Sequence, residues 1–114
     1  MNSLKSVKEV CEIAGITRKT LFYYDRISLL EPTVRIGVQK IKMYDDCALD
    51  KLLKIRRYRE AGLSVSQIRS IFAGTDEKVI LQEVMDRLCA EKSHAEYQIK
   101  LVGKMIEGDS HETD

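Results

Sequence analysis

Two basic side chains, Arg18 and Lys19, follow Thr17 at the point where the sequence pattern predicts the start of a helix. Their guanidinium and ammonium groups are hydrogen-bond donors that suit the O6 and N7 acceptors of guanine. One turn later come Phe22, which can contact a thymine methyl group, and Tyr23, which can donate to a phosphate. These side chains are typical of a helix that contacts DNA bases. The alternative is that the basic pair is solvated surface.

A second set of polar side chains suits the phosphate backbone. It comprises Arg35, Lys40 and Lys42 in a predicted hairpin, Arg56 and Arg59 on a later helix, and Ser64 at the start of the next helix. We expect the hairpin cations at phosphates or in a minor groove. The later three are expected at a second stretch of backbone, because a helix N-terminus itself attracts phosphate. A basic helix face is often only solvated, so each of these residues also has that alternative.

Three cysteines, with no close pair among them, argue against a disulfide framework. Cys11 is expected to pack inertly in the first helix, and Cys47 lies beside two aspartates that oppose thiolate formation. For Cys89 a redox or metal role stays open. His94 lies five residues further on, a spacing that does not stack the two on one helix face. No zinc site and no cofactor are predicted.

Composition favours a soluble, mainly helical protein. The 114 residues are 44% hydrophobic and 32% charged, with one proline and no tryptophan. The net charge of +1 conceals an asymmetry, because residues 1–62 carry +5 and residues 63–114 carry −4. No stretch resembles a secretory signal or a membrane span, so the cytoplasm is the default location. Phosphate-binding glycine loops, activated nucleophiles and paired carboxylates are missing, so we expect no enzyme.

Two short helices are predicted near the N-terminus. The sequence Ser6–Glu9 has the form of a capping box, and Gly15 is expected to end the helix that it opens. The expected apolar face of this first helix consists of Val7, Val10, Cys11 and Ala14. Thr17 then caps a second helix that ends near Arg26, with Leu21 and Tyr24 facing the core. Two short helices joined around a glycine are typical of a helix-turn-helix.

A small hairpin is expected next, because Pro32 stops helix continuation and Gly37 separates two short extended segments. Its second arm alternates in polarity, with Lys40 and Lys42 on one face and Ile41 and Met43 on the other. A third helix is expected from Asp45 or Asp46 to Gly62. Its predicted apolar stripe consists of Leu49, Leu52, Leu53 and Ile55. A second capping box at Ser64 opens a fourth helix that runs to about Phe72.

The last predicted helix begins after Gly74 and continues to about Glu107, a length of roughly 45 Å at about 1.5 Å per residue. Side chains spaced alternately four and three apart along it form a coiled-coil seam. The seam consists of Leu81, Met85, Leu88, Lys92, Ala95, Ile99, Val102 and Ile106. Only Lys92 interrupts its apolar character. The alternative is an amphipathic helix that folds back on its own domain.

Three stretches of the sequence resemble the MerR family of transcription regulators. They are SVKEVCEIAGITRKTLFYYDRISLLEP, MYDDCALDKL and KIRRYREAGLSVSQIRSIF, in register across about residues 6–72. Three features depart from the family pattern. Phe22 stands where arginine or histidine is frequent, the hairpin lacks the usual Asn-Gly-Tyr-Arg pattern, and Lys42 replaces a common arginine. These departures leave the expectation of DNA binding intact, but the DNA sequence that the family prefers cannot be carried over to this chain.

The resemblance implies a winged helix-turn-helix DNA-binding domain over residues 1–73 and a dimerisation helix over 74–107. Residues 108–114 are polar and are expected to form a flexible tail. The resemblance also implies an antiparallel homodimer that binds a palindromic promoter operator in double-stranded DNA, distorts that DNA and meets RNA polymerase there. No membrane partner is expected. One alternative is a DNA-architectural or recombination accessory protein with the same winged domain. Another is a coiled-coil adaptor whose DNA-binding domain is vestigial.

Overall fold

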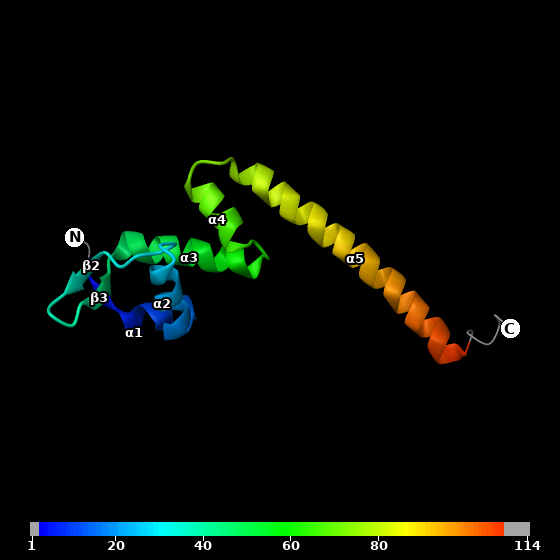
Figure 1. The fold of residues 1–114 in the computed structure, drawn as a ribbon, viewed down its shortest axis with the longest axis horizontal. Helices are drawn as coiled ribbons and strands as arrows, with labels where there is room; N and C mark the ends of the chain where they lie inside the picture. Colours follow the sequence, from blue (N-terminus) through cyan, green and yellow to red (C-terminus); the bar gives the residue numbers. More distant parts are fainter. Residues whose placement is uncertain (1–2, 109–114) are drawn as a thin grey trace. The chain divides into compact units, whose positions relative to one another are not determined.

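The computed structural model describes residues 3–108, which fall into two compact units with a boundary between Ala73 and Gly74 (Figure 1). In the described residues, the first unit contains four helices and a small sheet, and the second contains one helix. The predicted fold class, a winged helix-turn-helix followed by a long helix, is confirmed. The predicted tail lies outside the described residues, except for Gly108.

The helix-turn-helix consists of α1 (Val7–Ala14) and α2 (Arg18–Arg26). The capping box at the start of α1 is confirmed. The Ser6 hydroxyl accepts a hydrogen bond from the Glu9 amide at 3.2 Å, and Glu9 Oε1 accepts one from the Ser6 amide at 2.9 Å. Gly15 ends α1 at a φ of 68°, where a residue without a Cβ is favoured. The short turn that follows leads directly into α2.

Three strands, β1 (Lys5–Ser6), β2 (Val34–Ile36) and β3 (Ile41–Tyr44), form an antiparallel sheet in the order β1-β3-β2. The hairpin of β2 and β3 is the predicted wing. Its register places Arg35 opposite Lys42. The sequence did not predict β1, because two residues are too few to show a strand periodicity.

The wing carries its charged side chains on one face and its apolar side chains on the other. Arg35 and Lys42 share a face because they are cross-strand partners. Val34, Ile36 and Ile41 lie on the opposite face, since successive side chains of a strand alternate. These three apolar side chains are 38% to 52% exposed.

Lys40 does not take part in this alternation, so its predicted place on the same strand face as Lys42 is wrong. It lies in the hairpin turn with a φ of 55°, and its amide donates to the Gly37 carbonyl at 3.1 Å. Closing the hairpin requires a left-handed residue there, which removes Lys40 from the strand pattern.

Two further helices, α3 (Asp46–Glu60) and α4 (Val65–Phe72), complete the first unit. Asp45 caps α3 through its side chain, and the predicted capping box at Ser64 is formed at the start of α4. Leu53 was expected in the buried stripe of α3 but is 38% exposed. It follows the fully buried Leu52 by one residue, a rotation of about 100° that carries it to the edge of the stripe.

The core of the first unit draws side chains from α1 to α4 and from β3. The largest fully buried ones are Tyr44, Leu21, Leu30, Leu52, Ile55, Leu63, Ile68 and Val10. Tyr44 is the polar member of this set, and its hydroxyl has no hydrogen-bond partner among the described residues. Burial raises the pKa of Tyr44 to about 12. The phenol therefore stays neutral inside the core.

The second unit is the long helix α5 (Glu77–Glu107), which Asp76 caps at its start. Ile80 and Val84 are its buried residues. The coiled-coil seam predicted from the sequence lies on this helix and is called the α5 seam below. Its apolar side chains are largely exposed, up to 80% for Ile106. In the described part of the chain, no helix has the length and apolar character needed to cross a membrane.

Replacing Tyr44 by phenylalanine tests the cost of its buried hydroxyl. We expect Tyr44→Phe to leave the free energy of unfolding unchanged or to raise it by up to about 2 kcal/mol, because a buried polar group without a partner is destabilising. Urea unfolding of both proteins measures the difference. Tyr97→Phe, at an exposed position of α5, is the control. A loss of more than about 1 kcal/mol in Tyr44→Phe would show that the hydroxyl has a stabilising partner.

Candidate nucleic-acid interface

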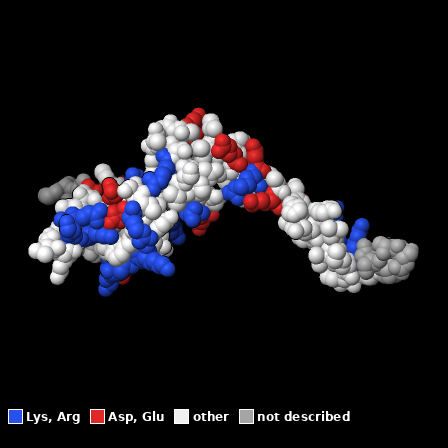
Figure 2. All heavy atoms as spheres, viewed as in Figure 1, with Lys and Arg blue, Asp and Glu red and all other residues white. Residues whose placement is uncertain are grey.

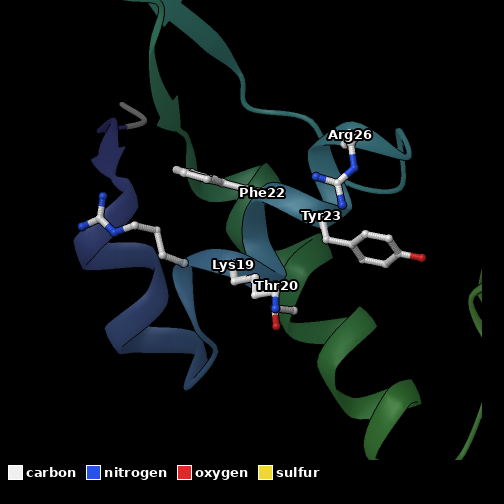
Figure 3. A pocket seen from close by; sticks show the side chains of 6 residues that line it. Lys19, Thr20, Phe22, Tyr23 and Arg26 are labelled. Carbon is white, nitrogen blue, oxygen red and sulfur yellow. The ribbon is translucent and has the colours of Figure 1, made fainter.

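The outward surface of α2 forms an open hollow (Figure 3). It is lined by Arg18, Lys19, Thr20, Phe22, Tyr23 and Arg26. Leu21 and Tyr24 lie on the other side of the helix and are buried, as the sequence predicted. The core thus holds α2 from behind and leaves a row of basic and aromatic side chains at the surface.

A helix cap fixes the backbone at the start of α2, where Arg18 and Lys19 lie. The Thr17 hydroxyl accepts from the Thr20 amide at 3.1 Å and lies 3.0 Å from the Thr20 hydroxyl. Thr17 therefore caps α2, and its predicted contact with DNA stays a prediction. Arg18 and Lys19 are the first two residues of α2, and both are exposed. This is the end of the helix at which an anion is most favoured.

Arg26 is a lining residue that the sequence reasoning missed. Its guanidinium lies 5.4 Å from the centre of the Tyr23 ring. Figure 3 shows Phe22 and Tyr23 pointing to opposite sides of α2. The spacing of three residues between Tyr23 and Arg26, which stacks side chains on one helix face, was the available signal.

The second set of predicted backbone contacts lies on α3 and α4. The Arg56 guanidinium lies beside the Gly15 turn, where an added Cβ would come within 3.5 Å of Nη2. Arg59 Nη1 donates to the Leu63 carbonyl at 3.0 Å. The Ser64 hydroxyl is engaged in the α4 capping box. Arg59 and Ser64 therefore have hydrogen-bond partners within the chain, and the contacts of all three residues with DNA stay predictions.

Asp25, in the last turn of α2, binds two cations of the wing, Arg35 and Lys42. Arg35 donates through Nη2 to Oδ1 at 2.7 Å and through Nη1 to Oδ2 at 2.8 Å. The Lys42 ammonium lies 2.8 Å from Oδ2. Asp25 is only 8% exposed, so the wing and α2 are joined through a nearly buried carboxylate. The sequence analysis did not identify this residue.

Lys42 also contacts the aromatic side chain on the same face of α2. Its ammonium lies 4.0 Å from the centre of the Phe22 ring, which is within cation–π range. Phe22 and Asp25 are three residues apart, so one helix face offers Lys42 a carboxylate and a ring. Two of the three wing cations predicted to meet DNA, Arg35 and Lys42, are thus bound to α2 in the free protein.

The Asp25 carboxyl group is strongly acidic in this setting. The hydrogen bonds from Arg35 lower the pKa of Asp25 from 3.8 to about 2, against the effect of burial. The same hydrogen bonds raise the pKa of Arg35. Asp25 and Arg35 are therefore both charged near neutral pH. Two basic side chains thus surround one carboxylate.

Basic side chains gather over the part of the first unit that carries the wing and the first two helices, as Figure 2 shows. The acids in the same view are concentrated elsewhere, apart from those close to the wing. A surface of this sign attracts a polyanion over several ångströms and favours association with nucleic acid.

The cysteines do not combine with other ligands in the described residues. Burial raises the pKa of the Cys11 thiol, which agrees with the expectation that it packs inertly. Cys47 and Cys89 are exposed. Within residues 3–108, no three histidine, cysteine, aspartate or glutamate side chains cluster in a way that suits a metal ion.

The acid stability of the protein tests the Asp25 ion pairs. Because the folded pKa lies below its ordinary value, Asp25 stabilises the fold above about pH 4, and this contribution is lost as pH falls through about 2. It amounts to something on the order of 2 kcal/mol. We expect Asp25→Asn to flatten the fall in the free energy of unfolding between pH 4 and 2, measured by urea titration. Asp50→Asn, an exposed acid on α3, should leave that slope unchanged.

Comparison with known proteins places this geometry in a family. The model of the MerR HTH family regulatory protein matches residues 5–75, which include the helix-turn-helix, the wing, α3 and α4. The HTH-type transcriptional activator mta of Bacillus subtilis is 29% identical over 102 residues, which cover 88% of this chain and 39% of that protein. A probable heavy metal-dependent transcriptional regulator of Haemophilus influenzae is 26% identical, and the match covers 93% of this chain and 83% of the relative.

A solved structure agrees with the sequence matches. The crystal structure of MtaN, the N-terminus of the Bacillus subtilis multidrug transporter activator, has a TM-score of 0.80 and 28% sequence identity. The match covers 90% of this chain and 97% of that chain. The chain spans less than half the length of mta and of the HmrR regulator of Sinorhizobium medicae. The matched domain, the order of its elements and its fold show that the chain belongs to the MerR family of helix-turn-helix regulatory proteins.

Proposed function

We propose that the protein is a sequence-specific, DNA-binding transcription regulator that acts as a homodimer on a palindromic promoter operator. The observation that carries the proposal is the exposed, basic surface of α2, capped by Thr17 and held from behind by the core. It occupies the second helix of a helix-turn-helix, the helix that enters the major groove in such domains.

The base contacts are assigned to the first half of α2. Arg18 and Lys19 offer donors to guanine edges, and Phe22 offers an apolar surface to a thymine methyl group. Tyr23 is assigned to a phosphate. Arg26, which stacks on the Tyr23 ring, extends the positive surface in the same direction.

The phosphate contacts are assigned to two places that flank α2. The wing supplies Lys40 at its turn, together with the cation pair bound to Asp25. The other place is the region of Arg56, Arg59 and the start of α4. Anchoring the backbone on both sides of a recognition helix fixes its register on the duplex.

The α5 seam supplies the dimer. The second half of the seam lines an open apolar hollow with Ala95, Gln98, Ile99, Val102, Gly103 and Ile106. An apolar stripe of this length on a helix is covered in a coiled coil by a second helix. The proposed partner is a second copy of the chain, paired antiparallel as in the family.

A dimer of this kind contacts half-sites about one helical turn apart, roughly 34–36 Å. Where the two binding surfaces and the half-sites are out of phase, the DNA bends or untwists, at a cost on the order of 1–6 kcal/mol. We assign to this distortion the effect on transcription, with RNA polymerase as the partner at the promoter. The runner-up, a DNA-architectural role, differs in where the operator lies.

Selection from random duplex DNA tests sequence-specific binding. We expect an enriched palindrome, and we expect Arg18→Ala to relax the preference at one base pair of each half-site at a cost of about 1–3 kcal/mol. Gel-shift titration on the enriched duplex measures the loss. Arg57→Ala, an exposed α3 change of equal charge, should keep the preference. A selection that enriches no sequence would refute the regulator assignment.

Sedimentation equilibrium at micromolar concentration tests the dimer. Ile99 is 70% exposed in the single chain and lies in the α5 seam, so Ile99→Glu should give a monomer, because it places a charge in the apolar interface. Tyr97→Glu, off the seam on the same helix, should remain a dimer. Lys92→Leu should raise thermal stability or allow larger oligomers, since Lys92 is the polar interruption of the seam. A monomeric wild type would contradict the proposal.

A further inference from the structure

The wing places two like charges directly opposite each other. Arg35 and Lys42 are cross-strand partners, an arrangement that is destabilising unless an opposite charge compensates it. Asp25 provides that charge from α2 through three contacts of 2.7 to 2.8 Å. The wing cations are therefore gathered around one anion in the free protein.

This arrangement has the geometry of a phosphate contact. A guanidinium binds carboxylate and phosphate oxygens in the same two-pronged way, and an ammonium adds a point charge to either. The Asp25 carboxylate thus makes the contacts with Arg35 and Lys42 that a DNA phosphate would make with the same two side chains. Two cations share one carboxylate, so one positive charge is left over for an external anion.

The two cations are not held equally. Arg35 bonds both carboxylate oxygens, whereas Lys42 contacts Oδ2 alone and rests on the Phe22 ring. If Lys42 moved away, both oxygens of Asp25 would keep a hydrogen bond from Arg35. If Arg35 moved away, Oδ1 would lose the hydrogen bond from Nη2, and a nearly buried carboxylate would be left poorly compensated. Lys42 is therefore the cation that can be exchanged.

We propose that Asp25 is a positioning residue that binds Lys42 as long as the protein is free. When α2 binds its target DNA, Lys42 leaves Asp25 and binds a backbone phosphate instead. Arg35 stays on Asp25 and keeps the wing in place. The proposal rests on the proposed DNA-binding function and deepens it. A loose encounter with unrelated DNA leaves Lys42 on Asp25, so this cation strengthens binding to the target duplex selectively.

Salt titrations of DNA affinity test the exchange. The probes are the duplex that the wild type enriches from random DNA and an unselected duplex of equal length. Lys42→Met should lower the slope of log affinity against log salt by about 0.9 on the enriched duplex, the value for one phosphate contact, and leave the slope on the unselected duplex unchanged. Equal changes on both duplexes, or no change on either, would overturn the proposal.

Asp25→Asn gives the complementary result. Releasing Lys42 should raise affinity for the unselected duplex about five- to tenfold at 0.1 M salt and so reduce discrimination. The double variant Asp25→Asn with Lys42→Met should lose the part of that gain that Lys42 contributes and keep only the part that comes from the uncompensated Arg35. Asp50→Asn is the matched control, since it changes the net charge equally on α3. A gain of the same size in Asp50→Asn would show that only net charge matters and would overturn the assignment to Asp25.

A spectroscopic measurement follows the exchange directly. The ¹⁵N resonance of the Lys42 ammonium should shift when the enriched duplex is added and stay in place with the unselected one. Its shift should exceed any shift of the Arg35 guanidinium, which keeps both hydrogen bonds to Asp25. A moving Arg35 signal with a static Lys42 signal would overturn the proposal. If the wild type enriches no sequence at all, the proposed function fails. If it enriches a sequence but the Lys42→Met salt slopes and the Lys42 resonance behave alike on the enriched and the unselected duplex, only this inference fails.

Discussion

The Asp25 carboxylate is the constraint on which the surface of the first unit depends. β1 and the buried Tyr44 hold the end of β3 on the core, whereas the apolar side chains of β2 and of the start of β3 are exposed, so packing contributes little to the orientation of that outer part of the wing. The ion pairs with Arg35 and Lys42 supply that orientation from α2. Since α2 is itself fixed by buried Leu21, the wing and the recognition surface form one rigid arrangement. Loss of the carboxylate would leave two cations uncompensated at its centre.

Local signals carried most of the helix prediction. The capping boxes at Ser6 and Ser64 and the single caps at Thr17, Asp45 and Asp76 each depend on residues within one turn. Sequence alone therefore located the described helix starts to within one residue, leaving only the choice between Asp45 and Asp46 and between Thr75 and Asp76 open. The buried faces of α1 and α2 followed from periodicity for the same reason. Leu53 lay at the margin of its stripe, where periodicity does not decide between burial and exposure.

What the sequence could not show depends on contacts between distant residues. Asp25 is ten residues from Arg35, and no local pattern indicates that the two wing cations meet it. They therefore looked like free DNA contacts. Lys40 was misplaced for a related reason, because the turn register that takes it out of the strand is set by pairing across the hairpin. The amphipathic α5 seam, by contrast, is visible in sequence because its spacing is regular along one helix.

The wing turns its charged side chains toward α2 and exposes its apolar ones, and this arrangement also affects how the protein resists aggregation. β2 is an edge strand, and the side chains that flank Arg35 on it are exposed and apolar, as in segments that recruit further strands. Two features oppose such growth. The strand is only three residues long, and its middle residue points a charge inward, where an added strand would have to accommodate it. The charge that orders the wing against α2 therefore also discourages the wing from templating a fibre.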